Sequence, residues 1–339
     1  MCSRTPSTSS GISRTGRWGA DDILRFLAWR LGQVGLTLIL LALVAFVAIR
    51  TAPGGPAYVL LGAERATPEA VARVNQQLGL DKPLPEQLVV WTSTLLHGDM
   101  GFSYFFRRPA IEVVQERLPA TLLLGGCAWL LSSSAGVAAG VWAARRRGAW
   151  IDRLLSTAAI GIVATPTFWM GIVLIVIFAA WLHLLPSAGL APVGQENDLG
   201  QRVRYLLLPL LALAAPHGAS LALYTRATML EALAADYVRT ARAKGLGDWR
   251  VAWRHALRNA GIPILTIVGL NIPHLVEGSV VVESVFAWPG IGQLTVASVG
   301  RRDYPVLLAI TLLVALAVVL ANLATDLVYR AVDPRIEFS

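Results

Sequence analysis

Four polar residues stand in an otherwise apolar stretch in the last third of the chain, and they are the side chains best suited to chemistry. Asn271, His274 and Glu277 follow one another at intervals of three residues, and Glu283 comes six residues later. Intervals of three place the first three residues on roughly one face of a helix. Ionisable groups inside a membrane are costly and normally face protein or water. Two interpretations therefore stand side by side: a polar lining for a solute path, and packed polar contacts between helices.

Other chemistry finds little support in the residues. His274 and Glu277 could also pair with each other, and a membrane-embedded hydrolase built on them would need further ligands or a nucleophile on adjoining segments. His217 is interpreted as a structural group in an apolar segment. The two cysteines, Cys2 and Cys127, offer neither a disulfide framework nor a metal-binding spacing. We expect no catalytic residue and no metal site.

The chain has no evident means of binding ATP. Its two lysines, Lys82 and Lys244, do not follow the glycine-rich GxxxxGK pattern that cradles phosphates. We therefore expect no cofactor on this chain, and any ATP and magnesium that drive it belong to partner subunits.

The elements that must position these residues are membrane helices. Hydrophobic residues make up 55% of the chain, charged residues only 15%, and the mean hydropathy is +0.59. These values exceed what a soluble domain of this size carries. The net charge of +8 comes from arginines beside apolar segments, which favours membrane topology over nucleic-acid binding.

Six apolar segments are candidate membrane spans, each of which takes about 20 helical residues; the first is short by itself and is expected to begin within Leu27–Gln33. Pro166 should bend the third span or begin a new helix, and the small residues Gly136 and Gly140 should let neighbouring helices approach closely. The predicted spans are Val34–Ile49, Ala120–Ala143, Leu154–Trp181, Tyr205–Tyr224, Gly261–Phe286 and Pro305–Tyr329.

The distribution of basic residues predicts the orientation. With the N-terminus inside, the two short inner loops carry 11 lysines and arginines and the two short outer loops carry 4. Because basic residues are retained on the cytoplasmic side, both termini are predicted to be cytoplasmic. The expected fold class is an all-α polytopic membrane protein with six transmembrane helices.

The domain organisation follows from these spans. We expect a disordered basic extension over residues 1–25, a first transmembrane helix over 26–50, and an extracytoplasmic insert over 51–119 that contains small helices. A transmembrane core over 120–335 completes the chain. The outer loops 184–204 and 289–304 contain proline and glycine and are expected to be irregular.

A polar interruption at residues 231–260 separates the fourth and fifth spans. It predicts two short amphipathic helices, the first ending at Lys244 with Gly245 in the left-handed conformation. Asp248 is expected to cap the second helix. In that helix an apolar stripe, including Trp249 and Ala252, recurs at helical spacing beside a stripe of arginines. We interpret this 231–260 loop as a docking element that rests against a partner at the membrane surface.

Several stretches resemble one family of membrane proteins. They are DYVRTARAKGLGDWRVAWRHALRNAGIP (236–263), RTAPGGPA (50–57), GDMGFSYFFRRPAIEVVQERLPATLLL (98–124), VVVESVFAWPGIGQL (280–294), RRDYPVLL (301–308) and NLATDLVYRAVDPR (322–335). In this order they are similar to the permeases of ATP-binding-cassette importers of the dipeptide, oligopeptide and nickel branch. The first stretch resembles the cytoplasmic EAA loop of that family.

The resemblance implies a type I importer permease in the cytoplasmic (inner) membrane of a prokaryote. It implies a second homologous permease, two ATPase subunits and an extracytoplasmic solute-binding protein as partners, with a heterodimer of permeases suggested by the peptide branch. The family's Glu-Ala-Ala falls on Arg239, Thr240 and Ala241, and its glycine falls on Gly245. The loop then carries the coupling to the ATPases, and the candidate residues are Arg239, Thr240, Ala241, Arg242, Lys244, Gly245, Leu246, Asp248 and Arg250.

The expected solute is a di- or oligopeptide. Nickel or another small solute in the same role is an alternative, because similar permeases carry such cargo. An ion-coupled secondary transporter is the alternative from another class, but it would be favoured by inverted repeats, and we find no convincing repeat of one half of the chain in the other.

Overall fold

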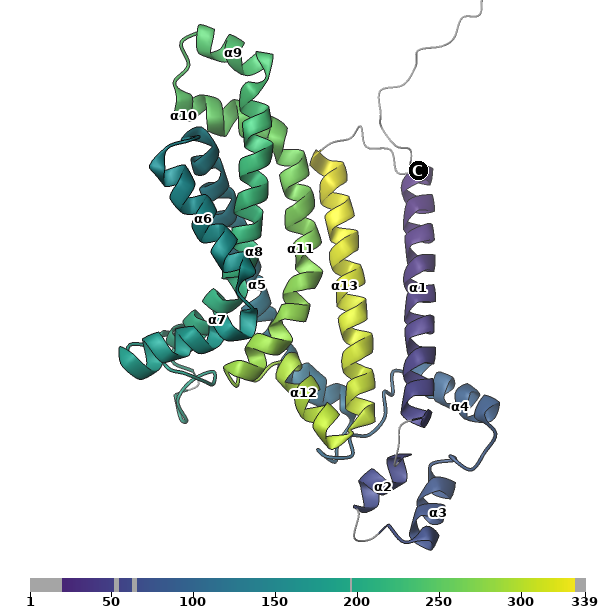
Figure 1. Cartoon of the computed structure of the whole chain (residues 1–339). Helices are drawn as coiled ribbons and strands as arrows, with labels where there is room; N and C mark the ends of the chain where they lie inside the picture. Colours follow the sequence, from purple (N-terminus) through teal and green to yellow (C-terminus); the bar gives the residue numbers. More distant parts are fainter. Residues whose placement is uncertain (1–19, 52–54, 63–65, 196, 333–339) are drawn as a thin grey trace, which may run out of the picture.

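The protein is a bundle of long helices with short helices at both ends (Figure 1). The computed structural model describes residues 20–51, 55–62, 66–195 and 197–332. Within these ranges every regular element is helical, apart from one isolated bridge between Phe102 and Pro109. The predicted all-α class is therefore confirmed for the described part of the chain.

Five long helices form the body of the molecule, and their order follows the apolar segments of the sequence. They are α1 (Ala20–Thr51), α5 (Ala110–Arg145), α8 (Leu199–Ala234), α11 (Leu257–Val285) and α13 (Tyr304–Val332). A core cluster that includes Leu124, Leu213 and Phe286 fills the space between α5, α8 and α11. Burial of these apolar side chains holds the three helices together.

Among the described residues, three helices are long and apolar enough to cross a membrane. They are α5, α8 and the 304–323 part of α13, and the bent pair described next raises the number to four if it counts as one span. The apolar part of α1, residues 32–48, is shorter than the length required of a span. The six-span count and the orientation stay predictions.

The third predicted span is broken at Pro166. Helix α6 (Trp150–Ala164) ends there, and α7 (Thr167–Leu174) continues into a π-helical segment, η1 (Ile175–Trp181), at an angle of 106° to α6. Proline lacks the N–H that a continuous helix needs, and it forces the preceding Thr165 into an extended conformation with ψ of 125°. The predicted break is confirmed, whereas a straight span over 154–181 is not what forms.

Helices α5 and α8 pack closely because glycines lie at their interface. A Cβ on Gly136 would lie 2.6 Å from the Gly218 carbonyl oxygen, and one on Gly140 would lie 2.6 Å from the Ala222 carbonyl oxygen. The expectation that these small residues permit close approach is confirmed.

Replacing Gly140 by alanine should therefore destabilise the bundle. The added methyl group must push backbone atoms of α8 away, which we expect to cost about 1–3 kcal/mol. The check is the melting temperature of the purified protein in detergent. Gly126→Ala on the same helix is the control, since no atom of a neighbouring element lies within 4 Å of the Cβ that it adds. An equal loss in both variants would contradict the close-packing explanation.

Short helices occupy the two ends of the bundle. The predicted insert contains α2 (Gly55–Leu61), α3 (Pro68–Gln77) and α4 (Leu84–Leu96), and Figure 1 places them at the end opposite α9 (Asp236–Ala243) and α10 (Asp248–Arg250). The expectation of an irregular 289–304 loop is wrong, because α12 (Ile291–Arg301) forms there. The predicted extension over 1–25 lies largely outside the described residues, and α1 already begins at Ala20.

Candidate functional site

The 231–260 loop folds as the sequence predicts in its first half. Helix α8 ends at Ala234, the extended Ala235 turns the chain, and α9 follows. Val238 and Ala241 lie on one face of α9 and are buried against Val251 and neighbouring apolar side chains. The opposite face, which carries Arg239 and Thr240, is exposed. A polar helix face is therefore held at a fixed orientation by the apolar face beneath it.

The turn after α9 is a Schellman motif. Gly245 has a positive φ of 77°, its N–H donates to the Arg242 carbonyl at 2.9 Å, and the Leu246 N–H donates to the Ala241 carbonyl at 3.3 Å. These two bonds satisfy carbonyls that the end of a helix leaves without partners, and Leu246 packs near Ala241. The prediction for Lys244 and Gly245 is confirmed.

The prediction that Asp248 caps the second helix is wrong. The extended Gly247 occupies the cap position and Asp248 is the first residue of α10. Its carboxylate lies 3.3 Å from the Arg242 Nε, so that it closes the turn from the other side. Both side chains are more than half exposed, and an exposed pair of this kind contributes little to stability.

The second helix is not short. Helix α10 continues through a π-helical turn, η2 (Val251–Ala256), into α11, so that helical structure runs without interruption from Asp248 to Val285. The end of the 231–260 loop and the helix with the polar residues 271–283 therefore belong to one continuous helical segment, which changes direction between α10 and α11 (Figure 1). A π-helical turn at the junction is a feature that recurs at functional sites.

The apolar stripe of this helix packs against the chain itself. Ala252 and Ala256 are buried in a cluster with Val141 of α5 and Met229 of α8. Trp249 is 58% exposed and lies 5.0 Å below the Arg145 guanidinium, in cation–π contact. The chain itself therefore covers Ala252 and Ala256 of the stripe, whereas Trp249 stays exposed beside the polar and basic face.

The structure brings most of the predicted coupling residues to one exposed surface. Ala241 is the exception, because it is buried beneath α9, and Leu246 is half-buried. Exposed at this end of the molecule are Arg239, Thr240, Arg242, Lys244, Gly245, Asp248 and Arg250. We call this set the coupling surface.

The polar residues that are predicted to lie within the membrane are all on α11. Asn271 is half-buried. His274 and Glu277 belong to the same helix, and their side chains lie outside the described ones. No contact in the described part of the structure decides between a solute path and packed contacts for these three residues.

Glu283 has a different environment, because its side chain is fully buried at the end of α11. Its carboxylate accepts hydrogen bonds from the Thr121 hydroxyl at 2.7 Å and from the Gly292 N–H at 2.6 Å. The Gln293 N–H adds a third bond at 3.2 Å. The carboxylate therefore satisfies the N-terminal N–H groups of α12, where a negative charge is favoured by the helix dipole.

Neighbouring contacts extend this connection to α5. The Thr121 hydroxyl accepts from the Ile291 N–H at 2.8 Å, and the Trp288 indole N–H donates to the Ala120 carbonyl at 3.0 Å. Helices α5, α11 and α12 are thus joined by a buried hydrogen-bond network around Glu283. We call this network the Glu283 junction.

Sequence reasoning missed a second buried carboxylate, Asp303. It accepts from the Ser103 hydroxyl at 2.5 Å and from the N–H groups of Tyr104 and Phe105 at 3.1 and 3.2 Å. The loop before α5 is thereby fixed to the start of α13. Arg301 strengthens the same contact from above the Phe105 ring, 3.5 Å from its centroid. The sequence signal that could have revealed this contact is the acidic Asp303 directly after Arg301 and Arg302, in a stretch that was expected to be irregular.

A third buried carboxylate, Asp152, lies where α6 begins. Arg226 of α8 binds it through two hydrogen bonds of 2.6 and 3.0 Å, and the Gly148 N–H donates to it at 2.9 Å. The Asp152 side chain is buried and that of Arg226 is partly exposed, so loss of the arginine would leave a buried carboxylate without its cation; the pair thus joins α6 to α8. This contact ties the loop between α5 and α6 to α8.

Comparison with known proteins gives a consistent picture. The family described as "Binding-protein-dependent transport system inner membrane component" matches residues 136–338, and the N-terminal model of the same component matches residues 23–125. A probable peptide ABC transporter permease protein, y4tP of Sinorhizobium fredii, is 39% identical over 314 residues, covering 92% of this chain and 99% of that protein.

Two further relatives come from Escherichia coli. The dipeptide transport system permease protein DppB of strain K12 is 36% identical over 335 residues, covering 93% of this chain and 99% of its own. The glutathione transport system permease protein GsiC of strain O6:H1 is 39% identical over 316 residues, covering 93% and 100%.

Among solved structures, the MetNI methionine ABC transporter in an inward-facing conformation is similar in fold. The TM-score is 0.53 at 18% identity, and the alignment covers 65% of this chain and 96% of that chain. This similarity extends to the architecture alone.

Proposed function

The chain belongs to the family of binding-protein-dependent transport system inner membrane components, and from this premise we propose that it is one permease of an ATP-driven importer of short peptides. The relatives named for a peptide, a dipeptide and glutathione support the substrate class. In this proposal a second homologous permease completes the path, two ATPase subunits bind ATP and magnesium, and an extracytoplasmic protein delivers the peptide.

One observation carries the mechanism: the coupling surface, on α9 and the turn after it, is attached to a continuous helical segment that runs into the bundle. Helical structure is unbroken from Asp248 to Val285, and α9 is fixed to the start of this segment by buried apolar contacts with Val251. Closure of the ATPase pair would move residues 239–248 as one body and swing α8 and α11. Alternating access then is a shift between two states whose bias comes from nucleotide bound to the partners.

The charges of the coupling surface favour this assignment. Arg239 and Arg242 pair with Asp236 and Asp248. With Lys244 and Arg250, which are also exposed, the face keeps a net positive charge, which suits a partner with acidic groups in its cleft. In the proposed topology this face is cytoplasmic, where ATP is available, and the insert containing α3 lies outside. The proposed location is the inner membrane of a prokaryote.

Labelling of single cysteines tests the topology and the contact together. After removal of Cys2 and Cys127, Thr240→Cys should react with a membrane-impermeant maleimide only in inside-out vesicles, and Thr67→Cys only in intact cells. Both positions are exposed; Thr240 belongs to α9 and Thr67 caps α3, and these two helices lie at opposite ends of the molecule (Figure 1). In the assembled transporter, Thr240→Cys should also cross-link to an ATPase subunit.

The outcomes separate the alternatives. Labelling of Thr240→Cys from outside would overturn the proposal. Peptide uptake driven by an ion gradient, in vesicles that hold the permeases without the ATPases, would instead favour the ion-coupled secondary transporter. Ligand screening of the cognate solute-binding protein distinguishes peptides from nickel.

A further inference from the structure

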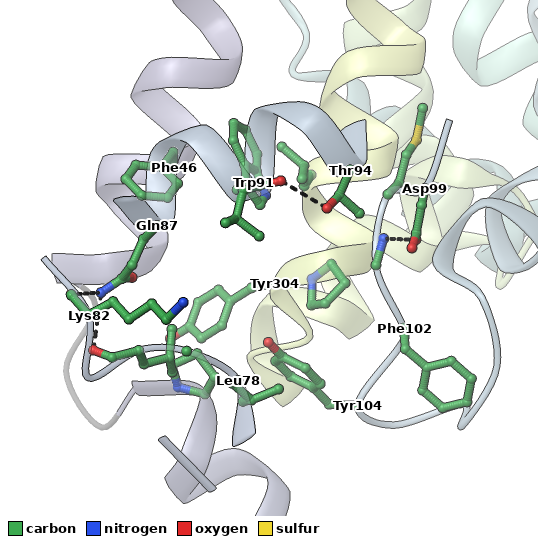
Figure 2. Close-up of a pocket in the computed structure, with 18 residues that line it drawn as sticks. Phe46, Leu78, Lys82, Gln87, Trp91, Thr94, Asp99, Phe102, Tyr104 and Tyr304 are labelled. Carbon is green, nitrogen blue, oxygen red and sulfur yellow. Dashed lines mark hydrogen bonds between the residues drawn. The ribbon is translucent and has the colours of Figure 1, made fainter. Parts of the chain in front are cut away.

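A cavity of about 330 Å³ lies between the insert and the bundle, away from the coupling surface (Figure 2). Its walls come from the end of α1, from α2, from the segment between α3 and α4, from α4, from the loop before α5 and from the start of α13. Phe46, Trp91 and Tyr304 are among the aromatic residues that line it. Segments far apart in the sequence thus converge on one pocket, which we call the outer pocket.

The outer pocket has one positive and one negative residue in its wall. Figure 2 shows the Lys82 side chain reaching into the pocket toward Tyr304, and Asp99 on the other side, beside Thr94. The Asp99 Oδ1 accepts from the Gly101 N–H at 2.8 Å, so that the carboxylate is held in place while its second oxygen remains available to a ligand. Both side chains are exposed.

Hydrogen bonds in the structure position both charged residues. The buried Gln87 side chain donates to the carbonyls of Leu80 and Lys82, at 3.1 and 2.7 Å, and so fixes the backbone that carries the lysine. On the other side, Gly101 packs against Pro305, to which a Cβ would lie 3.3 Å away. The backbone segments that carry both charged residues are therefore held in place, and so is the Asp99 carboxylate.

We propose that the outer pocket binds a short peptide through its two free ends, with the peptide ammonium at Asp99 and its carboxylate at Lys82. Charge-assisted hydrogen bonds of these two kinds are stronger than neutral ones. The aromatic wall receives the peptide side chains, and the hydroxyl groups of Tyr104 and Tyr304 contribute polar contacts. This inference rests on the proposed function and adds a site on the permease itself.

The size of the pocket favours short peptides. A volume of about 330 Å³ is at the small end of the range of ligand pockets, roughly 300–1,000 Å³. Because Lys82 and Asp99 both line this pocket, a peptide that binds both must have its ammonium and its carboxylate within the same pocket. A segment inside a longer chain offers neither end, so it would lose both ionic contacts.

Direct binding to the purified transporter tests the proposal. The complete permease–ATPase complex, in lipid nanodiscs and without the solute-binding protein, is titrated with the dipeptide Ala-Phe and with N-acetyl-Ala-Phe-amide by saturation-transfer NMR. The free dipeptide should bind, and Lys82→Gln or Asp99→Asn should each weaken it at least tenfold. Asparagine keeps an oxygen for the Gly101 N–H, so the loop is preserved.

Two control variants each remove a charge from a residue that does not line the pocket: Asp81→Asn beside Lys82, and Arg73→Gln on α3. Both should bind the dipeptide as the parent does. Equal binding of the blocked peptide, or unchanged binding by both charge variants, would overturn the inference.

The proposed function can fail separately. If the transporter with its solute-binding protein takes up Ala-Phe but the complex alone does not bind it, only the outer pocket is refuted. If the complete system takes up another solute and no peptide, the proposed function falls, whatever the pocket binds.

Discussion

Replacing Gly292 by alanine should largely abolish the folded protein. A Cβ at this position would overlap the Val280 Cα and would lie 2.9 Å from the Glu283 Oε2, so neither a backbone atom nor a buried carboxylate leaves it space. The start of α12 would have to move away from α11, and the Gly292 N–H would lose its 2.6 Å bond to Glu283. Overpacking of this kind together with an unsatisfied buried group should cost roughly 3 kcal/mol or more.

The measurement is the yield and melting temperature of the protein purified in detergent. Gly300→Ala is the matched control, since it makes the same change in the same helix at a position where no atom lies within 4 Å. Alanine is the better helix former, so this variant should be neutral or slightly more stable. Gly292→Ala protein that melts at the parent's temperature would contradict the buried contact with Glu283.

The Glu283 junction also bears on transport. Because α5, α11 and α12 share this hydrogen-bond network, the end of α11 is bonded both to α12 and to Thr121 of α5. We therefore expect these three parts to move together if α11 moves during transport. Glu283 thus serves packing in the described structure, the second of the two interpretations that its position in an apolar segment allowed.

The sequence predicts much of the fold because local signals dominate there. Apolar segments give the long helices, and Pro166 gives the break between α6 and α7. Helix α12 escaped prediction since its segment contains Gly292 and Gly300 and its N-terminus is satisfied by Glu283, a side chain of another helix. A cap that arrives through tertiary packing leaves no pattern at the helix start itself.

The candidate site shows the same division. Gly245 predicted the turn correctly, because a glycine that follows a lysine at the end of a helix is a local sequence signal. The apolar stripe correctly predicted that Ala252 would be buried. The pattern of a stripe does not tell whether a partner or the chain itself covers it, and in this structure α5 and α8 cover Ala252. The contact of Asp248 with Arg242 depends on the three-dimensional course of the turn, which composition does not give.

Replacing Gly245 by valine should uncouple ATP hydrolysis from transport while the protein still folds and inserts. The backbone at Gly245 has φ of 77°, which costs an L-residue about 1–2 kcal/mol and suits a β-branched residue least. No atom lies within 4 Å of a Cβ there, so the strain acts on the turn rather than on the core. Since 1.4 kcal/mol is a factor of ten, roughly a tenfold loss of peptide-stimulated ATPase activity is expected in reconstituted transporter.

Gly247→Val isolates the conformational cause. Gly247 lies two residues further along the same exposed turn, also with no atom within 4 Å of a Cβ, but its φ of −65° and ψ of 147° are accessible to valine. The same side chain is thus added to the same surface without backbone strain, and coupling should persist. If both variants lose coupling equally, obstruction of the ATPase by the added side chain is the cause. If Gly245→Val couples as well as the parent, the shape of this turn does not transmit the motion and the rigid coupling surface is refuted.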